Sequence, residues 1–314
     1  MLYEVSGHLE TADLLISFTM NKNIGIIGLG RVGMPASRAY IAAGYHVFGN
    51  ARRPEVIAEF ESMGGMHFPN PEELAHHTDM VLVLVLNDDQ VIEVVCGSKG
   101  LLKGLGPGST IVCMSTINRY NLEMVAGKCA EKNIKFVDCP FTGGPARVPK
   151  GSLTLIAAAP LQLIESVTPV LSVIGNVVYV GEQPGLGQAV KHCNQLLVGA
   201  THAATMEVIT LARKLGLDPA KVCEVIAGGI AGSDYFRLLS DSVLTKKPSP
   251  GGLGQMCKDI SIVVNTAREV KMPAYVATAA SQYFLTAEAL GMHDREGADL
   301  IEVVERTANK NIDS

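Results

Sequence analysis

The chain lacks tryptophan, has few aromatic residues (5%) and carries no surplus of basic residues, since its formal net charge is −5. The missing basic surplus argues against a nucleic-acid partner, which usually requires a basic patch or stripe. No run of about 18 apolar residues occurs, so we expect no membrane span. The chain instead has 314 residues, 47% of them hydrophobic, and 32 glycines. This composition is typical of a two-domain α/β enzyme that acts on a small molecule.

Paired cysteines and metal-ligand spacings are missing as well. The seven cysteines are odd in number and widely spaced without a CxxC pair, and the eight histidines show no HExxH spacing. We therefore predict reduced thiols, a cytoplasmic location and no metal site. Residues 1–19 lack the basic start and long apolar middle of a signal peptide, and Met20 follows them. We expect residues 1–22 to be an extension outside the fold.

Short apolar runs alternate with helical patterns in the first part of the chain. These runs are continuous rather than alternating, as in parallel strands that are covered on both faces. The predicted strands are 23–28, 45–49, 80–86, 110–114, 135–138, 153–158 and 176–181. From residue 185 onwards every segment has helical periodicity, beginning with a long helix to about residue 215. We predict an α/β domain with a mostly parallel, doubly wound sheet over 23–183, and an all-α domain over 184–314 that the long helix joins to it.

The stretch GIIGLGRVG places three glycines in a GxGxxG pattern directly after the first strand and at the start of a helix. Glycines there permit a tight turn and let backbone N–H groups approach a pyrophosphate, whose charge a helix N-terminus favours. A turn built only for close packing of helix on strand is the alternative. We predict a dinucleotide site in this loop. Its residues are Gly28, Leu29, Gly30, Arg31, Val32 and Gly33.

The acidic residue that binds the ribose of NAD, expected about 20 residues beyond the glycines, is absent. Residues 46–53 read HVFGNARR, and the first carboxylate after them is Glu55. Asn50 can accept a hydrogen bond from the ribose, while Arg52 and Arg53 can bind a 2′-phosphate. We therefore predict NADP(H) as the preferred cofactor, with NAD(H) as a possible one. The alternative is that both arginines only face water at the start of a helix.

Four stretches, in this order, carry a resemblance to a known family: GIIGLGRVG, VCMSTINRYNLEMVAGKCAEKNIKFVDCPFTGGPARVPKGSLTLI, GLGQAVKHCNQ and GQMCKDISIVV. Together they resemble the β-hydroxyacid dehydrogenase family, which includes 3-hydroxyisobutyrate dehydrogenase and tartronate semialdehyde reductase. The resemblance implies a Rossmann domain followed by a helical domain, with the active site between them, and a homodimer or homotetramer. It also implies NAD(P)-dependent interconversion of a small β-hydroxyacid and its semialdehyde or keto acid. The alternatives are an imine reductase, a group that typically lacks the lysine described next, another semialdehyde reductase, and a dinucleotide-binding protein without chemistry.

Lys191 is a lone charge in the otherwise nearly uncharged start of the long helix. Asn194, Gln188 and Gln195 share its face of the helix, because residues three and four apart are neighbours. The positive end of the helix dipole and partial burial should both lower the lysine pKa, which suits proton transfer at neutral pH. The resemblance implies that Lys191 is the general acid and base and that Asn194 holds substrate and lysine in register. The alternative is a lysine whose stem packs on the core while its ammonium reaches water.

The loop DCPFTGGPARVPKG follows a strand, at the edge of the sheet where ligands of α/β sheets bind. Thr142 offers a hydroxyl, and Gly143 and Gly144 allow two backbone N–H groups to converge on an anion. The resemblance implies that these residues hold the substrate carboxylate. The chain departs from the family's usual Ser at 142 and Ala at 139, where it has Cys139. The alternative is that the two glycines only form a turn.

The resemblance implies less specific roles for further residues. Ser115 and Thr116 match positions near the nicotinamide and the substrate, although a hydroxyl there can also cap the next helix. Cys113 replaces the acidic residue that the family usually has two positions before that serine.

Helix and strand ends supply the last predicted contacts. Ser233 matches a substrate contact, and Lys258, in a KD pair with Asp259, matches a cofactor contact. Adjacent opposite charges are also ordinary on a solvated helix surface. Leu86 and Asn87, at the end of a predicted strand, are expected to contact the cofactor through their backbones.

Overall fold

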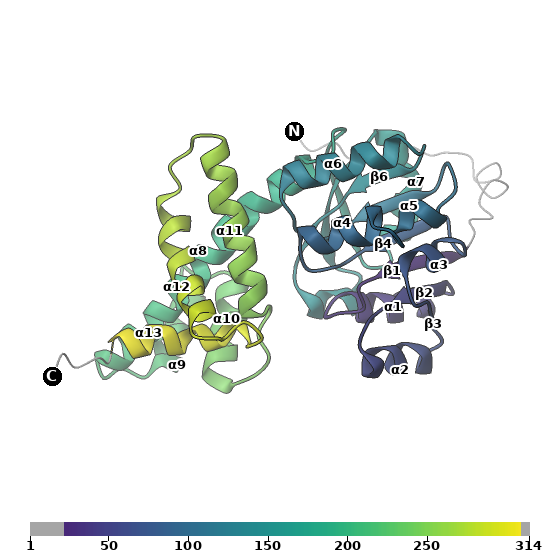
Figure 1. Ribbon diagram of the computed structural model, residues 1–314. Coiled ribbons are helices and arrows are strands. Elements are labelled where there is room, and N and C mark those ends of the chain that lie inside the picture. The colour runs from purple at the N-terminus through teal and green to yellow at the C-terminus, as the bar shows by residue number, and fades with distance from the viewer. Residues whose placement is uncertain (1–21, 309–314) are drawn as a thin grey trace, which may run out of the picture.

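The computed structural model describes residues 22–308, with an α/β part followed by a helical part (Figure 1). The predicted N-terminal extension lies outside the described residues, apart from Lys22.

One nine-stranded sheet forms the first part, in the order β3-β2-β1-β4-β5-β6-β8-β7, with β9 paired to β8. The strands are β1 (Asn23–Ile27), β2 (His46–Asn50), β3 (Met66–His67), β4 (Met80–Val83), β5 (Thr110–Cys113), β6 (Lys135–Asp138), β7 (Phe141–Thr142), β8 (Leu153–Ala158) and β9 (Gly175–Gly181). Strands β1 to β6 pair in parallel, whereas β8 runs antiparallel to β6 and β7. All seven predicted strands are present. The strand predicted to reach residue 86 ends at Val83, and the two-residue strands β3 and β7 are too short to show a periodicity.

Helices cover both faces of the sheet. They are α1 (Gly33–Ala42), α2 (Pro54–Ser62), α3 (Pro71–Ala75), α4 (Asp88–Cys96), α5 (Leu101–Gly104), α6 (Arg119–Ala130), α7 (Leu161–Leu171) and the 3₁₀ helix η1 (Pro145–Lys150). In β4, Leu82 joins an apolar cluster with Tyr40 and Phe60, whereas its neighbour Val81 joins a second cluster with Leu74. Successive strand residues point to opposite faces, so each face has its own core. This explains why the strands are continuous apolar runs.

The second part is helical, as predicted. Helix α8 (Leu186–Lys214) begins against the sheet and continues into this part, where the other helices pack on it (Figure 1). They are α9 (Pro219–Gly228), α10 (Asp234–Thr245), α11 (Leu253–Glu269), α12 (Tyr275–Ala289), the 3₁₀ helix η2 (Gly297–Leu300) and α13 (Ile301–Ala308). Met206, Ile260 and Phe284 lie in the core that these helices share.

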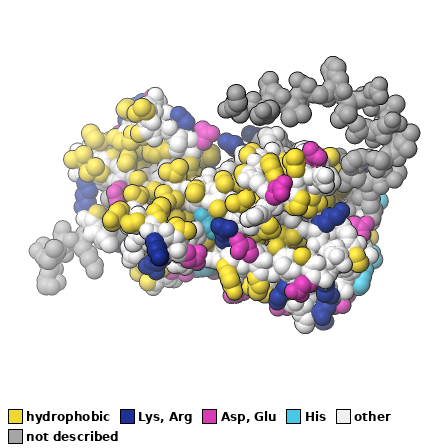
Figure 2. Space-filling view, turned by 90° about the horizontal axis from the view of Figure 1, so that it is seen from above, with side chains coloured by type: hydrophobic (Ala, Val, Ile, Leu, Met, Phe, Trp, Pro, Cys, Tyr) yellow, Lys and Arg dark blue, Asp and Glu magenta, His cyan; other side chains and the backbone are white. Residues whose placement is uncertain are grey.

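Many large apolar side chains of the helical part remain exposed. Leu197 and Leu211 of α8 and Tyr275 and Val276 of α12 are among them. Figure 2 shows apolar side chains gathered over the helical part on the face seen from above.

Over residues 22–308, no helix is both long and apolar enough to cross a membrane. All seven cysteines fall within the described residues and are free thiols there. The described residues also contain no group of three or more His, Cys, Asp or Glu side chains that is suited to a metal ion.

Candidate active site

The phosphate loop between β1 and α1 uses its three glycines in two different ways. A Cβ atom on Gly33 would lie 2.0 Å from the carbonyl oxygen of Gly28, and one on Gly28 would lie 2.6 Å from that of Leu84. Gly28 also has φ 99°, which favours glycine. A Cβ on the exposed Gly30, however, would meet no atom of the described chain within 4 Å. Packing therefore explains Gly28 and Gly33, whereas the open space at Gly30 fits a phosphate that approaches the backbone at the N-terminus of α1.

The predicted ribose end of this site lies at the end of β2. The Nδ2 of Asn50 donates to the carbonyl oxygen of Phe68 at 2.9 Å, which orients the side chain and leaves its Oδ1 as the acceptor. Arg52 and Arg53 are exposed, and Arg53 Nη1 lies 3.7 Å from Glu55 Oε1. Both arginines are therefore accessible to a phosphate group.

Lys191 is buried near the start of α8, with 8% of its surface exposed. Its Nζ lies 6.0 Å from the ring centroid of Phe141 in β7, next to the predicted carboxylate pocket. Burial lowers the pKa of Lys191 to about 8; the charge of Lys258 acts in the same direction, and that of Asp259 opposes it. The structure thus gives the expected direction of the pKa shift, with burial as the main cause.

A buried polar network lies beside Lys191. The Nζ of Lys258 is 2.7 Å from Asp259 Oδ1 and also donates to the carbonyl oxygen of Thr116. Gln195 Nε2 donates to Asp259 Oδ2 at 2.6 Å, and Asn194 Nδ2 donates to Gln195 Oε1 at 2.9 Å. The side chains of Lys258 and Asp259 are only 18% and 1% exposed, so the alternative of a solvated surface pair is wrong. The network joins the sheet part to α8 and α11 one turn from Lys191.

A second buried network lies around Asp138 at the end of β6, a residue that was not predicted from the sequence. Asp138 Oδ2 accepts from the backbone N–H of Gly185 at 2.8 Å, and its Oδ1 accepts from Gln188 Nε2 at 3.0 Å. Gln188 also donates to the carbonyl oxygen of Ser115 at 3.1 Å. Burial raises the pKa of Asp138 to about 6, although the hydrogen bonds from Gln188 and Gly185 oppose this shift. Asp138 thereby fixes the start of α8 on the sheet edge.

Two predicted hydroxyls have structural partners. Ser115 Oγ donates to the carbonyl oxygen of Val85 at 2.7 Å, and the residue that caps α6 is Asn118, whose Oδ1 accepts from the N–H of Tyr120. The alternative of a helix cap at residues 115 and 116 is therefore wrong. Ser233 is exposed and caps α10.

The predicted carboxylate pocket lies between β7 and η1. Gly143 and Gly144 have φ values of 121° and 75°, which residues other than glycine rarely adopt. Thr142 is the last residue of β7, directly after Phe141, whose ring faces Lys191. Phe141 is thus the residue through which this loop approaches the buried lysine.

Leu86 and Asn87, between β4 and α4, are both hydrogen-bonded to the start of α4. The N–H of Leu86 donates to Gln90 Oε1 at 2.9 Å, and Asn87 caps α4. The carbonyl oxygen of Asn87 also accepts from the N–H of Val91 at 3.1 Å. The carbonyl of Leu86 and the N–H of Asn87 are therefore the groups left for the predicted backbone contact.

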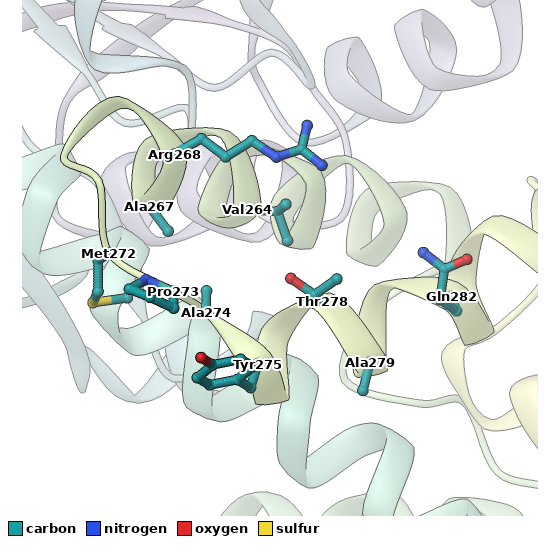
Figure 3. Close-up of a pocket in the computed structure, with 10 residues that line it drawn as sticks. All are labelled: Val264, Ala267, Arg268, Met272, Pro273, Ala274, Tyr275, Thr278, Ala279 and Gln282. Carbon is teal, nitrogen blue, oxygen red and sulfur yellow. The ribbon is translucent and has the colours of Figure 1, made fainter.

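A separate hollow of about 550 Å³ lies between α11 and α12, away from these residues (Figure 3). Its lining includes Val264, Arg268, Met272, Tyr275 and Gln282. This lining shares no residue with the predicted site.

Comparisons with known proteins bear on the family. Residues 23–181 match a family model described as the NAD binding domain of 6-phosphogluconate dehydrogenase. Residues 185–304 match the model described as NAD-binding of NADP-dependent 3-hydroxyisobutyrate dehydrogenase. The chain is 32% identical to L-threonate dehydrogenase of Cupriavidus necator over 286 residues, which cover 90% of this chain and 96% of the relative. The chain belongs to the β-hydroxyacid dehydrogenase family.

Comparisons with solved structures agree with this assignment. The 3-hydroxyisobutyrate dehydrogenase from Salmonella typhimurium superimposes with a TM-score of 0.83 at 27% identity, covering 90% of this chain and 99% of that one. Psf3 in complex with NADP⁺ and 2-OPP gives a TM-score of 0.82 at 25% identity, with coverages of 90% and 99%. The predicted fold class and the prediction of an NAD(P)-dependent oxidoreductase of this family are confirmed.

Proposed function

We propose that this β-hydroxyacid dehydrogenase interconverts a small β-hydroxyacid and its semialdehyde or keto acid, with Lys191 as general acid and base. The observation that carries the proposal is the burial of Lys191, which lowers its pKa to about 8, with its Nζ 6.0 Å from the ring centroid of Phe141, the neighbour of Thr142 in the chain. A lysine with such a pKa exchanges its proton readily near neutral pH. The relatives named L-threonate dehydrogenase and 3-hydroxyisobutyrate dehydrogenase support a small hydroxyacid as substrate.

In this proposal, different residues bind the substrate and transfer the proton. The Thr142 hydroxyl and the N–H groups of Gly143 and Gly144 hold the substrate carboxylate, and Asn194 orients the substrate beside the lysine. In reduction, the Lys191 ammonium donates its proton to the carbonyl oxygen. In oxidation, the neutral amine accepts the proton of the hydroxyl group. When bound, the nicotinamide supplies or accepts the hydride.

For the cofactor, we propose a preference for NADP(H). The loop 28–33 binds the pyrophosphate, Asn50 binds the ribose, and Arg52 and Arg53 bind the 2′-phosphate. The exposure of both arginines at the end of β2 supports this, as does the complex of Psf3 with NADP⁺. Arg52→Ala should then lower the ratio of kcat/KM for NADPH to that for NADH. An unchanged ratio would reject the preference.

We also propose the predicted organisation of the chain, with domains at 23–183 and 184–314 and a homodimer or homotetramer in solution. Val190, Leu197 and Leu211 are exposed on α8 at multiples of seven residues, so they lie on one face of the helix. Light scattering on the purified protein tests the assembly, and Leu197→Glu should shift it toward the monomer.

The test of the reaction compares Lys191→Ala with the wild type over a panel of three- and four-carbon semialdehydes and keto acids. We expect kcat to fall at least about 100-fold, as for loss of a general acid, with little change in the Kd of NADPH. Lys214→Ala, at the exposed end of the same helix, is the matched control. Retained turnover in Lys191→Ala rejects the mechanism. A wild type that binds NADPH and reduces only imines, or nothing, supports the corresponding alternative.

A further inference from the structure

The side chain of Arg31 leaves the phosphate loop and contacts the helical part of the chain. Its Nη1 lies 3.1 Å from Glu296 Oε1, and its Nη2 lies 3.3 Å from Glu296 Oε2. The same Nη2 donates to the backbone carbonyl of Ser249 at 2.7 Å. The guanidinium therefore binds the carboxylate with both of its prongs and is fixed by a third, shorter hydrogen bond.

Glu296, just before η2, is itself held in place. Both the N–H and the Oγ of the buried Ser249 donate to Glu296 Oε2, each at 2.8 Å. Gly252 pairs with Glu296 as an antiparallel bridge. Burial acts to raise the pKa of Glu296, but the hydrogen bonds from Ser249 and Arg31 and the arginine charge lower it overall. Glu296 is therefore an ionised and preoriented partner for Arg31 at neutral pH.

The loop 248–252, between α10 and α11, also reaches the predicted carboxylate pocket. A Cβ atom on Gly144 would lie 4.0 Å from the carbonyl oxygen of Pro250, which is ordinary van der Waals contact. The loop thus contacts Gly144 through Pro250 and Arg31 through Ser249. It lies against both of the loops to which we assign ligand binding.

We propose that Glu296 is a positioning residue for the cofactor, which acts through Arg31 to hold the phosphate loop and loop 248–252 together. The inference rests on the proposed function, because it assigns the pyrophosphate to loop 28–33. The two side chains are 43% and 42% exposed, so their pairing stabilises the fold little, and its loss should leave the fold intact. Without Arg31, the Glu296 carboxylate keeps its negative charge with no partner. This charge should slightly repel the cofactor phosphates.

The experiment measures the dissociation rate of NADPH from the full-length protein by stopped-flow fluorescence, or of NADH if the wild type binds NADH more tightly. Arg31→Ala should raise this rate about fivefold, the upper range for a half-exposed ion pair. Glu296→Gln should raise it about twofold to threefold, and the double variant should not exceed Arg31→Ala, because both changes remove one contact. The KM values for cofactor and hydroxyacid should rise while kcat does not fall.

Arg38→Ala is the matched control. It removes the exposed pair of Arg38 with Glu59, 3.4 Å apart, which lies entirely within the α/β part. It changes the net charge of the protein by the same amount as Arg31→Ala. Release from this variant should match the wild type. If Arg31→Ala accelerates release and Glu296→Gln does not, Arg31 acts on the cofactor directly and the role of Glu296 is wrong.

Unchanged release from both variants would overturn the inference while leaving the proposed function intact. A wild type that binds neither NADPH nor NADH would overturn both. Thermal unfolding checks the fold of each variant, and the near-isosteric Glu296→Gln keeps the test decisive if Arg31→Ala does not fold.

Discussion

The carboxylate of Asp138 accepts a hydrogen bond from the backbone N–H of Gly185 at 2.8 Å, so the last residue of a strand caps the helix that carries Lys191. Gly185, at the N-cap with φ 96°, has no side chain for this purpose. The N–H and Nε2 groups of Gln188 donate to the same carboxylate. The position of Lys191 relative to the sheet therefore depends on one buried acid in a different element.

Replacing Asp138 by Asn tests this dependence. The new amide nitrogen is a donor, and it would face Gln188 Nε2 or the N–H groups of α8, which are donors too. We expect Asp138→Asn to lower the free energy of unfolding by about 1 to 3 kcal/mol, as for an unsatisfied buried group, and to lower kcat. Urea denaturation and turnover measure both effects. Asp241→Asn, on an exposed residue of α10, is the control and should change stability by less than about 0.5 kcal/mol.

A substitution at Gly187 tests the contact between the start of α8 and the sheet. A Cβ atom there would lie 2.9 Å from Asp138 Cγ and from the carbonyl oxygen of Ile156, so α8 must move off the sheet to accommodate it. We expect Gly187→Ala to destabilise the protein by about 1 to 3 kcal/mol through overpacking. Gly127→Ala, in α6, adds a Cβ with no described atom within 4 Å and should instead stabilise by up to about 1 kcal/mol. Equal effects of the two changes would contradict the close approach.

The fold follows from the sequence where each element is specified locally. Val81 and Leu82 enter different cores, so both had to be apolar, and that run predicts a strand covered on both faces. The antiparallel turn of β8 against β6 is not predictable in this way, because strand direction depends on how the chain folds back after β7.

The candidate site was predictable in part. The spacing of Lys191 and Asn194 places both on one helix face, and the structure agrees. Asp138 and Asp259 form hydrogen bonds to this helix but are 47 and 64 residues from their partners Gly185 and Gln195. Local sequence patterns do not predict pairs so far apart in the chain. The burial of the Lys258 and Asp259 pair likewise depends on packing of α11 against α8 rather than on its own sequence.

Substitutions at Gly30 and Gly33 should affect different properties of the protein, cofactor binding at Gly30 and folding at Gly33. A Cβ on Gly30 meets open space in the described structure, whereas one on Gly33 would lie 2.0 Å from the carbonyl oxygen of Gly28. Gly30→Ala should leave the melting temperature nearly unchanged but raise the Kd of NADPH at least about tenfold, or about 1.4 kcal/mol. Gly33→Ala should prevent stable folding. Calorimetry and fluorescence titration distinguish the two, and unchanged NADPH binding by Gly30→Ala would reject the phosphate assignment.

The pKa of Lys191 sets the pH dependence of turnover. Reduction requires the ammonium form, so kcat for reduction should be constant at low pH and fall as the pH rises through about 8. Oxidation requires the neutral amine, so its kcat should rise through the same range. Parallel profiles for the two directions would show that another group controls the reaction.

Lys191→Met should make the protein more stable and inactive. A charged lysine with a pKa of about 8 instead of 10.5 destabilises the folded state by roughly 3 kcal/mol at pH 7, and Met has a similar volume without the charge. Between pH 8 and 10.5 the unfolded chain binds more protons than the folded one, so wild-type stability rises with pH across this window.

The stability advantage of Lys191→Met should therefore be largest below pH 8 and shrink toward pH 10.5. Urea denaturation of both proteins from pH 6 to 10 measures this difference. Lys214→Met, which removes an exposed lysine at the C-terminal end of α8, is the matched control. An advantage for Lys191→Met that does not change with pH would mean that packing, rather than the buried charge, separates the two proteins.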